Sequence, residues 1–160
     1  MWGRLVERVR AAFTHALAAS IAGALAFWAA RLLYGHQQPV FAAITAVICL
    51  APGIPNHLRQ GFNLLIGVTI GILVGELIFM IPFDFGEFRI ALAIFAAMLV
   101  AAMPGLAPVV SIQAGASALL VMVMGPTTGG IVRFLDVIVG VSIGAAFALA
   151  FFRRRPDDKA

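Results

Sequence analysis

Ionisable side chains inside apolar stretches are the first places in this sequence where chemistry could occur. Glu76 lies in the apolar run that ends before Pro82. A charged group in such surroundings is costly and is therefore a functional candidate. A buried carboxyl group there could exchange a proton near neutral pH, which makes Glu76 a candidate for proton coupling. The alternative is an interface carboxylate that simply pairs with an arginine.

Arg133 and Asp136 form the second candidate feature. They are three positions apart, which places them on one face of a helix, where their side chains can form an ion pair. Such a pair could lock its helix to a neighbouring helix, or it could take part in moving a charged solute. The sequence leaves both roles open.

Other polar groups could line a path for anions. Arginines at the ends of apolar runs would make an entrance positive and attract carboxylates, and a glutamine within an apolar run could bind a solute or a neighbouring helix. The predicted anion-binding set is Arg31, Arg59, Arg89, Arg133 and Gln113.

Enzyme chemistry has little support in the sequence. There is no glycine-rich phosphate loop, no Ser-His-Asp set and no HExxH motif. The single cysteine, Cys49, excludes an intrachain disulfide, and no Cys/His cluster suggests a metal. We therefore expect a protein that is not an enzyme, with no cofactor and no metal.

The amino-acid composition indicates the environment in which these residues lie. Of 160 residues, 62% are hydrophobic and 11% are charged, and the mean hydropathy is +1.05. A soluble domain of this size cannot bury so much apolar surface, whereas a bilayer can accommodate it. The basic residues sit at the ends of apolar segments, where they contact lipid headgroups and set orientation, so the net charge of +4 does not indicate nucleic-acid binding.

Proline, glycine and charge divide the chain into elements. They predict an all-α integral membrane fold, one transmembrane domain over 1–160 with short tails, and a first helix rather than a cleaved signal peptide at the N-terminus. The six predicted transmembrane helices lie at about 11–33, 39–52, 60–81, 88–103, 108–124 and 131–152, with a loop at 125–130.

The distribution of Lys and Arg predicts an orientation. Six spans place both tails on one side of the membrane, and that side carries eight of the basic residues against three on the other. The larger number indicates the cytoplasm, so both termini are predicted to be cytoplasmic. The eight residues are Arg4, Arg8, Arg10, Arg59, Arg153, Arg154, Arg155 and Lys159.

Two halves of the chain resemble each other. Pro39 and Pro108 open corresponding helices, and the glycine pairs of the third and sixth helices correspond as well. Three helices separate the two members of each match, so the copies would cross the membrane in opposite senses, as a 3+3 inverted repeat. The alternative is chance recurrence in a glycine-rich chain. The glycines themselves predict close helix packing, within the chain or between copies: Gly67, Gly71, Gly75, Gly140 and Gly144.

Several motifs together resemble the membrane domain of the fusaric acid resistance family, also called the aromatic acid exporter family. They are GHQQPVFAAITAV at 35–47, APG at 51–53, Leu58-Arg59, the glycines of the third helix, and Arg133 with Asp136 and Gly140. The plant aluminium-activated malate transporters are distantly similar. Phe41 stands where the family usually has tryptophan, and Leu64 where it often has arginine, so no role of that arginine is carried over.

The resemblance implies a function. It implies efflux of small organic anions, above all aromatic carboxylates, through the inner membrane. Typical members carry a second membrane half and a soluble domain, so this stretch resembles a single half that pairs with another copy, most simply as a homodimer. The alternative is a non-transporting membrane module that binds lipid or a separate soluble partner protein.

Overall fold

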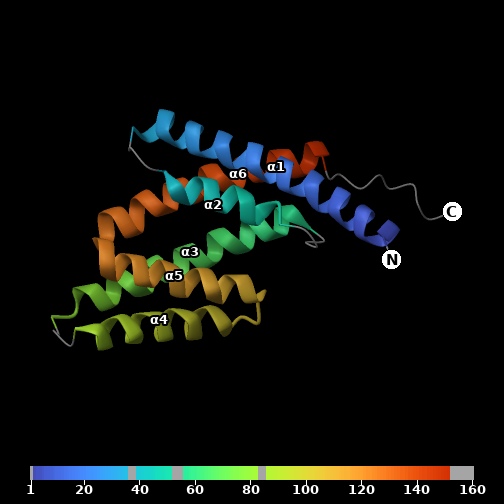
Figure 1. Cartoon of the computed structure of the whole chain (residues 1–160). Coiled ribbons are helices and arrows are strands. Elements are labelled where there is room, and N and C mark those ends of the chain that lie inside the picture. The colour runs from blue at the N-terminus through green and yellow to red at the C-terminus, as the bar shows by residue number, and fades with distance from the viewer. Residues whose placement is uncertain (1, 36–38, 52–55, 83–85, 152–160) are drawn as a thin grey trace. The chain divides into compact units, whose positions relative to one another are not determined.

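The computed structural model describes residues 2–35, 39–51, 56–82 and 86–151. Within these ranges the regular secondary structure is helical, which confirms the predicted all-α class. In chain order the elements are α1 (Trp2–Tyr34), α2 (Val40–Cys49), α3 (His57–Met80), α4 (Glu87–Ala102), α5 (Pro108–Gly125), the π-helix η1 (Pro126–Val132) and α6 (Arg133–Phe151) (Figure 1).

Several of these helices suit a membrane. Three stretches are long and apolar enough to cross one: Ala12–Tyr34, His57–Met80 and Pro108–Phe151. α2 is apolar but has 10 residues, which extend about 15 Å, and the 16 residues of α4 extend about 24 Å, against a hydrocarbon core of about 30 Å. The chain is therefore an integral membrane protein with several candidate spans.

The long stretch Pro108–Phe151 is bent back on itself. Arg133 and Gln113 are 20 positions apart, yet Arg133 Nη2 lies 3.0 Å from Gln113 Oε1, whereas a straight helix would separate them by about 30 Å. The reversal occurs at Gly125, whose φ of 83° is accessible to glycine. The loop predicted at 125–130 is wrong, because helical structure resumes at Pro126, whose fixed φ suits the first turn of a helix.

The chain divides into two compact units. The first unit comprises Met1–Gly61 and Val139–Ala160. In it, α1 and α2 lie side by side (Figure 1) and bury small side chains such as Ala22, Ala26 and Ala46. α6 also approaches α2 closely, because a β-carbon on Gly144 would lie 2.7 Å from Cys49 Cβ. Small residues allow these backbones to approach without a hydrophobic driving force.

The second unit comprises Phe62–Ile138. α4 lies beside α5 (Figure 1), with Ala93 and Ala97 of α4 and Ala114 of α5 in one buried cluster. α3 presents glycines to α5, so that a β-carbon on Gly67 would lie 2.5 Å from the Val110 carbonyl oxygen. This unit contains most of the predicted polar site.

Some predicted boundaries differ from the observed ones. α1 begins at Trp2, well before the predicted start near residue 11, and α3 begins at His57 rather than near residue 60. The predicted C-terminal tail, with its arginines at 153–155, lies outside the described residues, as do the loop positions 36–38 and 52–55 and most of the loop after Pro82.

Candidate functional site

A buried polar cluster joins the start of α6 to the middle of α5. Arg133 Nε donates a hydrogen bond to Ser117 Oγ at 3.0 Å, and Arg133 Nη2 donates one to Gln113 Oε1 at 3.0 Å. Ser117 Oγ donates in turn to the Gln113 backbone carbonyl at 2.7 Å. Gln113 and Ser117 are one helical turn apart, which is why both reach the same guanidinium group.

Asp136 supplies a negative charge near this cluster. It is completely buried, and it interacts electrostatically with Arg133, which is only 6% exposed. Charges in such surroundings need partners, because an isolated buried charge costs several kcal/mol. The cluster thus combines one cation and one anion and connects α5 to α6. The roles predicted for Arg133, in an ion pair and in anion binding, stay predictions.

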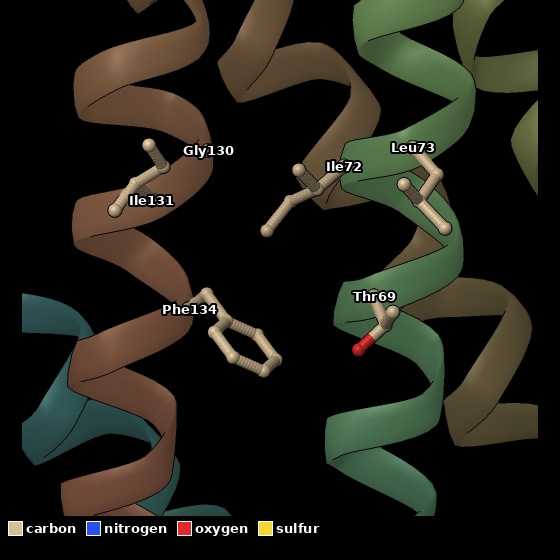
Figure 2. Close-up of a pocket in the computed structure, with 6 residues that line it drawn as sticks. All are labelled: Thr69, Ile72, Leu73, Gly130, Ile131 and Phe134. Carbon is tan, nitrogen blue, oxygen red and sulfur yellow. The ribbon is translucent and has the colours of Figure 1, made fainter.

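An apolar pocket lies between α3 and the segment formed by η1 and the start of α6. Figure 2 shows the Phe134 ring and the Ile72 and Thr69 side chains facing the space between these segments. The pocket has a volume of about 200 Å³, and a cavity of about 150 Å³ can hold benzene. Six residues line it: Thr69, Ile72, Leu73, Gly130, Ile131 and Phe134.

Glu76 lies beside one wall of this pocket. It follows Ile72 by four positions on the same face of α3, and its side chain is half-buried. A β-carbon on Gly130 would lie 3.0 Å from Glu76 Oε1 and 3.5 Å from Ile72 Cγ2. Because Gly130 has no side chain, it leaves room for the Glu76 carboxylate. Within the described ranges, Glu76 forms no hydrogen bond or ion pair.

The side chain of Arg89, in the first turn of α4, contacts the C-terminal end of α3. Its Nη2 atom donates to the Ile78 carbonyl at 3.0 Å and also to the Phe79 carbonyl, and its guanidinium group lies 5.3 Å from the centroid of the Phe79 ring. These contacts satisfy carbonyl groups that a helix end leaves open. Arg89 therefore stabilises the end of α3, and its predicted role in an anion entrance stays a prediction.

The remaining predicted arginines lie in the first unit. Arg31 is in the last turn of α1 and Arg59 is in the first turn of α3, and both side chains are exposed. The Arg59 backbone N–H donates to Asn56 Oδ1 at 3.0 Å, which satisfies one open donor at the start of α3. Anion binding by Arg31 and Arg59 stays a prediction.

Sequence reasoning missed the pocket. Thr69, Ile72 and Leu73 precede Glu76 by seven, four and three positions, a spacing that places all four residues on one helical face. This signal was available in the sequence. Phe134 was not identifiable, because its contribution depends on how α6 emerges from the π-helix η1.

The comparisons with known proteins identify the family. A family model described as "Fusaric acid resistance protein-like" matches residues 21–151. The chain belongs to this family. The resemblance predicted from the sequence is therefore confirmed.

Two kinds of relative match this fusaric acid resistance-like protein. It is 30% identical to an uncharacterised protein of Corynebacterium glutamicum over 139 residues, which are 86% of this chain and 36% of that relative. It is 27% identical over 162 residues to proteins of Mycobacterium bovis and Mycobacterium tuberculosis, each named "Putative arylamide transporter", covering 96% of this chain and 45% of each relative. The chain thus spans less than half the length of these relatives. No solved structure matches it.

Proposed function

We propose that this fusaric acid resistance-like protein transports small aromatic compounds outward across the membrane and catalyses no reaction. The observation that carries the proposal is the ring-sized apolar pocket in the second unit. Phe134 offers an aromatic face against which a bound ring can stack. The relatives named "Putative arylamide transporter" support a cargo that contains an aromatic ring.

The packing of glycines supports the proposed six-span inverted repeat. In the second unit, Gly67 of α3 lies against α5; in the first unit, Gly144 of α6 lies against α2. The repeat pairs α2 with α5 and α3 with α6. The contact of α3 with α5 in one half therefore corresponds to the contact of α6 with α2 in the other half. Inverted repeats present related surfaces to both sides of a membrane, which suits a path through it.

The topology and assembly are further parts of the proposal. The excess of Lys and Arg supports cytoplasmic termini in the inner membrane, and cysteine labelling from each side of the membrane tests it. A homo-oligomer, most simply a dimer, follows from the family resemblance. The mass of the purified protein in detergent tests that assembly.

The family resemblance predicts an aromatic carboxylate as cargo, and Glu76 is the predicted proton-coupling group, whereas the proposed function itself requires only an aromatic ring in the cargo. Flux of benzoate at several pH values tests both predictions. A pH dependence that disappears in Glu76→Gln supports proton coupling, because glutamine keeps the shape of the side chain and does not titrate.

The decisive experiment measures flux into proteoliposomes for benzoate, acetanilide and benzylamine. We expect flux of at least one compound to require the protein and to fall roughly two- to tenfold in Phe134→Ala, as for the loss of one aromatic contact. Phe95→Ala is the matched control, because Phe95 of α4 is 65% exposed and does not line the pocket. Absence of protein-dependent flux for all three compounds contradicts the proposal. A partner protein that co-purifies in that case favours a non-transporting membrane module.

A further inference from the structure

The side chains that line the pocket offer no hydrogen-bond donor to a ligand. Among the lining side chains, only Thr69 carries a polar atom, and its hydroxyl group already donates to the Leu65 carbonyl at 2.8 Å. The surface that a ligand would contact in the pocket is therefore apolar.

The charge next to the pocket is negative. Glu76 Oε1 lies against Gly130, a residue of the wall, and Glu76 extends the face of α3 that carries Thr69, Ile72 and Leu73. This face therefore combines an apolar surface at Ile72 and Leu73 with a carboxylate at Glu76. Arg133 is a buried cation that directly precedes Phe134 of the wall in sequence. Its Nε and Nη2 atoms donate to side chains of α5.

We propose that this pocket binds an aromatic amine in its protonated form, with a single ring against Phe134 and the ammonium group at Glu76. The proposal rests on the proposed function, because it names the class of aromatic compound that the same pocket selects. A charge-assisted hydrogen bond between an ammonium group and a carboxylate is stronger than a neutral one. The low dielectric of a membrane protein strengthens it further.

Other occupants fit these groups less well. A carboxylate such as benzoate would meet no side-chain donor in the wall and would be repelled by an ionised Glu76. A lipid acyl chain could fill the apolar volume but would leave the Glu76 carboxylate without a partner. A protonated amine on an aromatic ring satisfies the apolar wall and the charge together.

The test is equilibrium binding to the purified full chain in nanodiscs, with benzylamine, benzyl alcohol and benzoate as probes. Benzyl alcohol has the same ring and a neutral hydroxyl group in place of the ammonium group, so the comparison isolates the contribution of the positive charge. We expect benzylamine to bind about tenfold or more tightly than either of the other compounds. In Glu76→Gln this preference should disappear while benzyl alcohol binding persists, which shows that the variant is folded.

Glu87→Gln is the matched control, because Glu87 is an exposed acid at the start of α4 in the same unit. It should keep the preference for benzylamine.

Three results overturn the proposal. If benzoate binds as tightly as benzylamine, or if Glu76→Gln keeps the preference, the pocket does not select cations, although protein-dependent flux of any aromatic compound would still support the proposed function. If none of the three probes binds and none is transported, the cation site and the proposed function both fail.

Discussion

Replacing Gly71 by alanine tests the close approach of α3 and α5. A β-carbon at Gly71 would overlap the Ala114 carbonyl oxygen and would lie 2.7 Å from Ser117 Cβ. Ordinary contact begins at 3.4 Å, so the Ser117 contact alone would require the helices to separate by roughly 0.7 Å, and the overlap with the Ala114 carbonyl oxygen would require more. Overpacking of this kind costs about 1–3 kcal/mol. Alanine recovers about 1 kcal/mol in helix propensity.

The overlap at Gly71 involves backbone, which cannot rotate away as a side chain can. We therefore take the upper end of that range and expect a net loss of about 2 kcal/mol in the free energy of unfolding. Gly75→Ala is the matched control on the same face of α3. Its β-carbon would lie 3.1 Å from Ala118 Cα and from Val121 Cβ, so the neighbours need to move by only a few tenths of an ångström. This variant should be close to the wild type in stability.

Thermal unfolding in detergent micelles measures both variants. The predicted order of Tm places Gly71→Ala clearly below the wild type and Gly75→Ala near it. Equal Tm values for Gly71→Ala and the wild type would refute the reasoning. A larger decrease in Tm for Gly75→Ala than for Gly71→Ala would also refute it, because the close contacts of α3 with α5 would then not determine stability.

Three further variants or modifications test other parts of the structure. The predicted ion pair of Arg133 and Asp136 implies that Arg133→Met lowers the free energy of unfolding by about 3–5 kcal/mol, because the buried Asp136 then loses the nearby positive charge. Arg133→Met combined with Asp136→Asn should recover much of this loss, and no recovery in thermal unfolding would contradict the predicted pair. Cys49 is completely buried, so maleimide labelling should be slow in the folded protein and fast after denaturation; rapid labelling of the folded protein would contradict the burial. Arg89→Leu should speed amide exchange in the last turn of α3, because it removes the donors to the carbonyl groups there; unchanged exchange would show that Arg89 does not stabilise this end.

The helical class and the packing role of the glycines could be predicted from the sequence. Composition requires membrane helices, and glycines spaced by four positions, such as Gly67 and Gly71, indicate a face that lies close to another backbone. The partner helix could not be predicted, because spacing describes one helix and says nothing of its neighbour. The structure places α5 against Gly67 and Gly71, and α2 against Gly140.

The site could be predicted only in part. The spacing of Arg133 and Asp136 indicates that they can interact, but Ser117 lies 16 positions before Arg133 and reaches it only because the chain reverses at Gly125. The sequence Gly-Pro-Thr-Thr-Gly-Gly is typical of a loop, yet Pro126 begins the π-helix η1. That helix determines where Gly130 and Phe134 lie, so the pocket depends on a local conformation that propensity does not predict.

Flux of aromatic compounds into proteoliposomes is the measurement that decides whether this protein is a transporter. We expect at least one of benzoate, acetanilide and benzylamine to enter vesicles that contain the protein faster than empty vesicles. Phe134→Ala should slow this entry, and Phe95→Ala should not. Equal entry into empty and protein-containing vesicles for all three compounds would contradict transport of aromatic compounds by this protein.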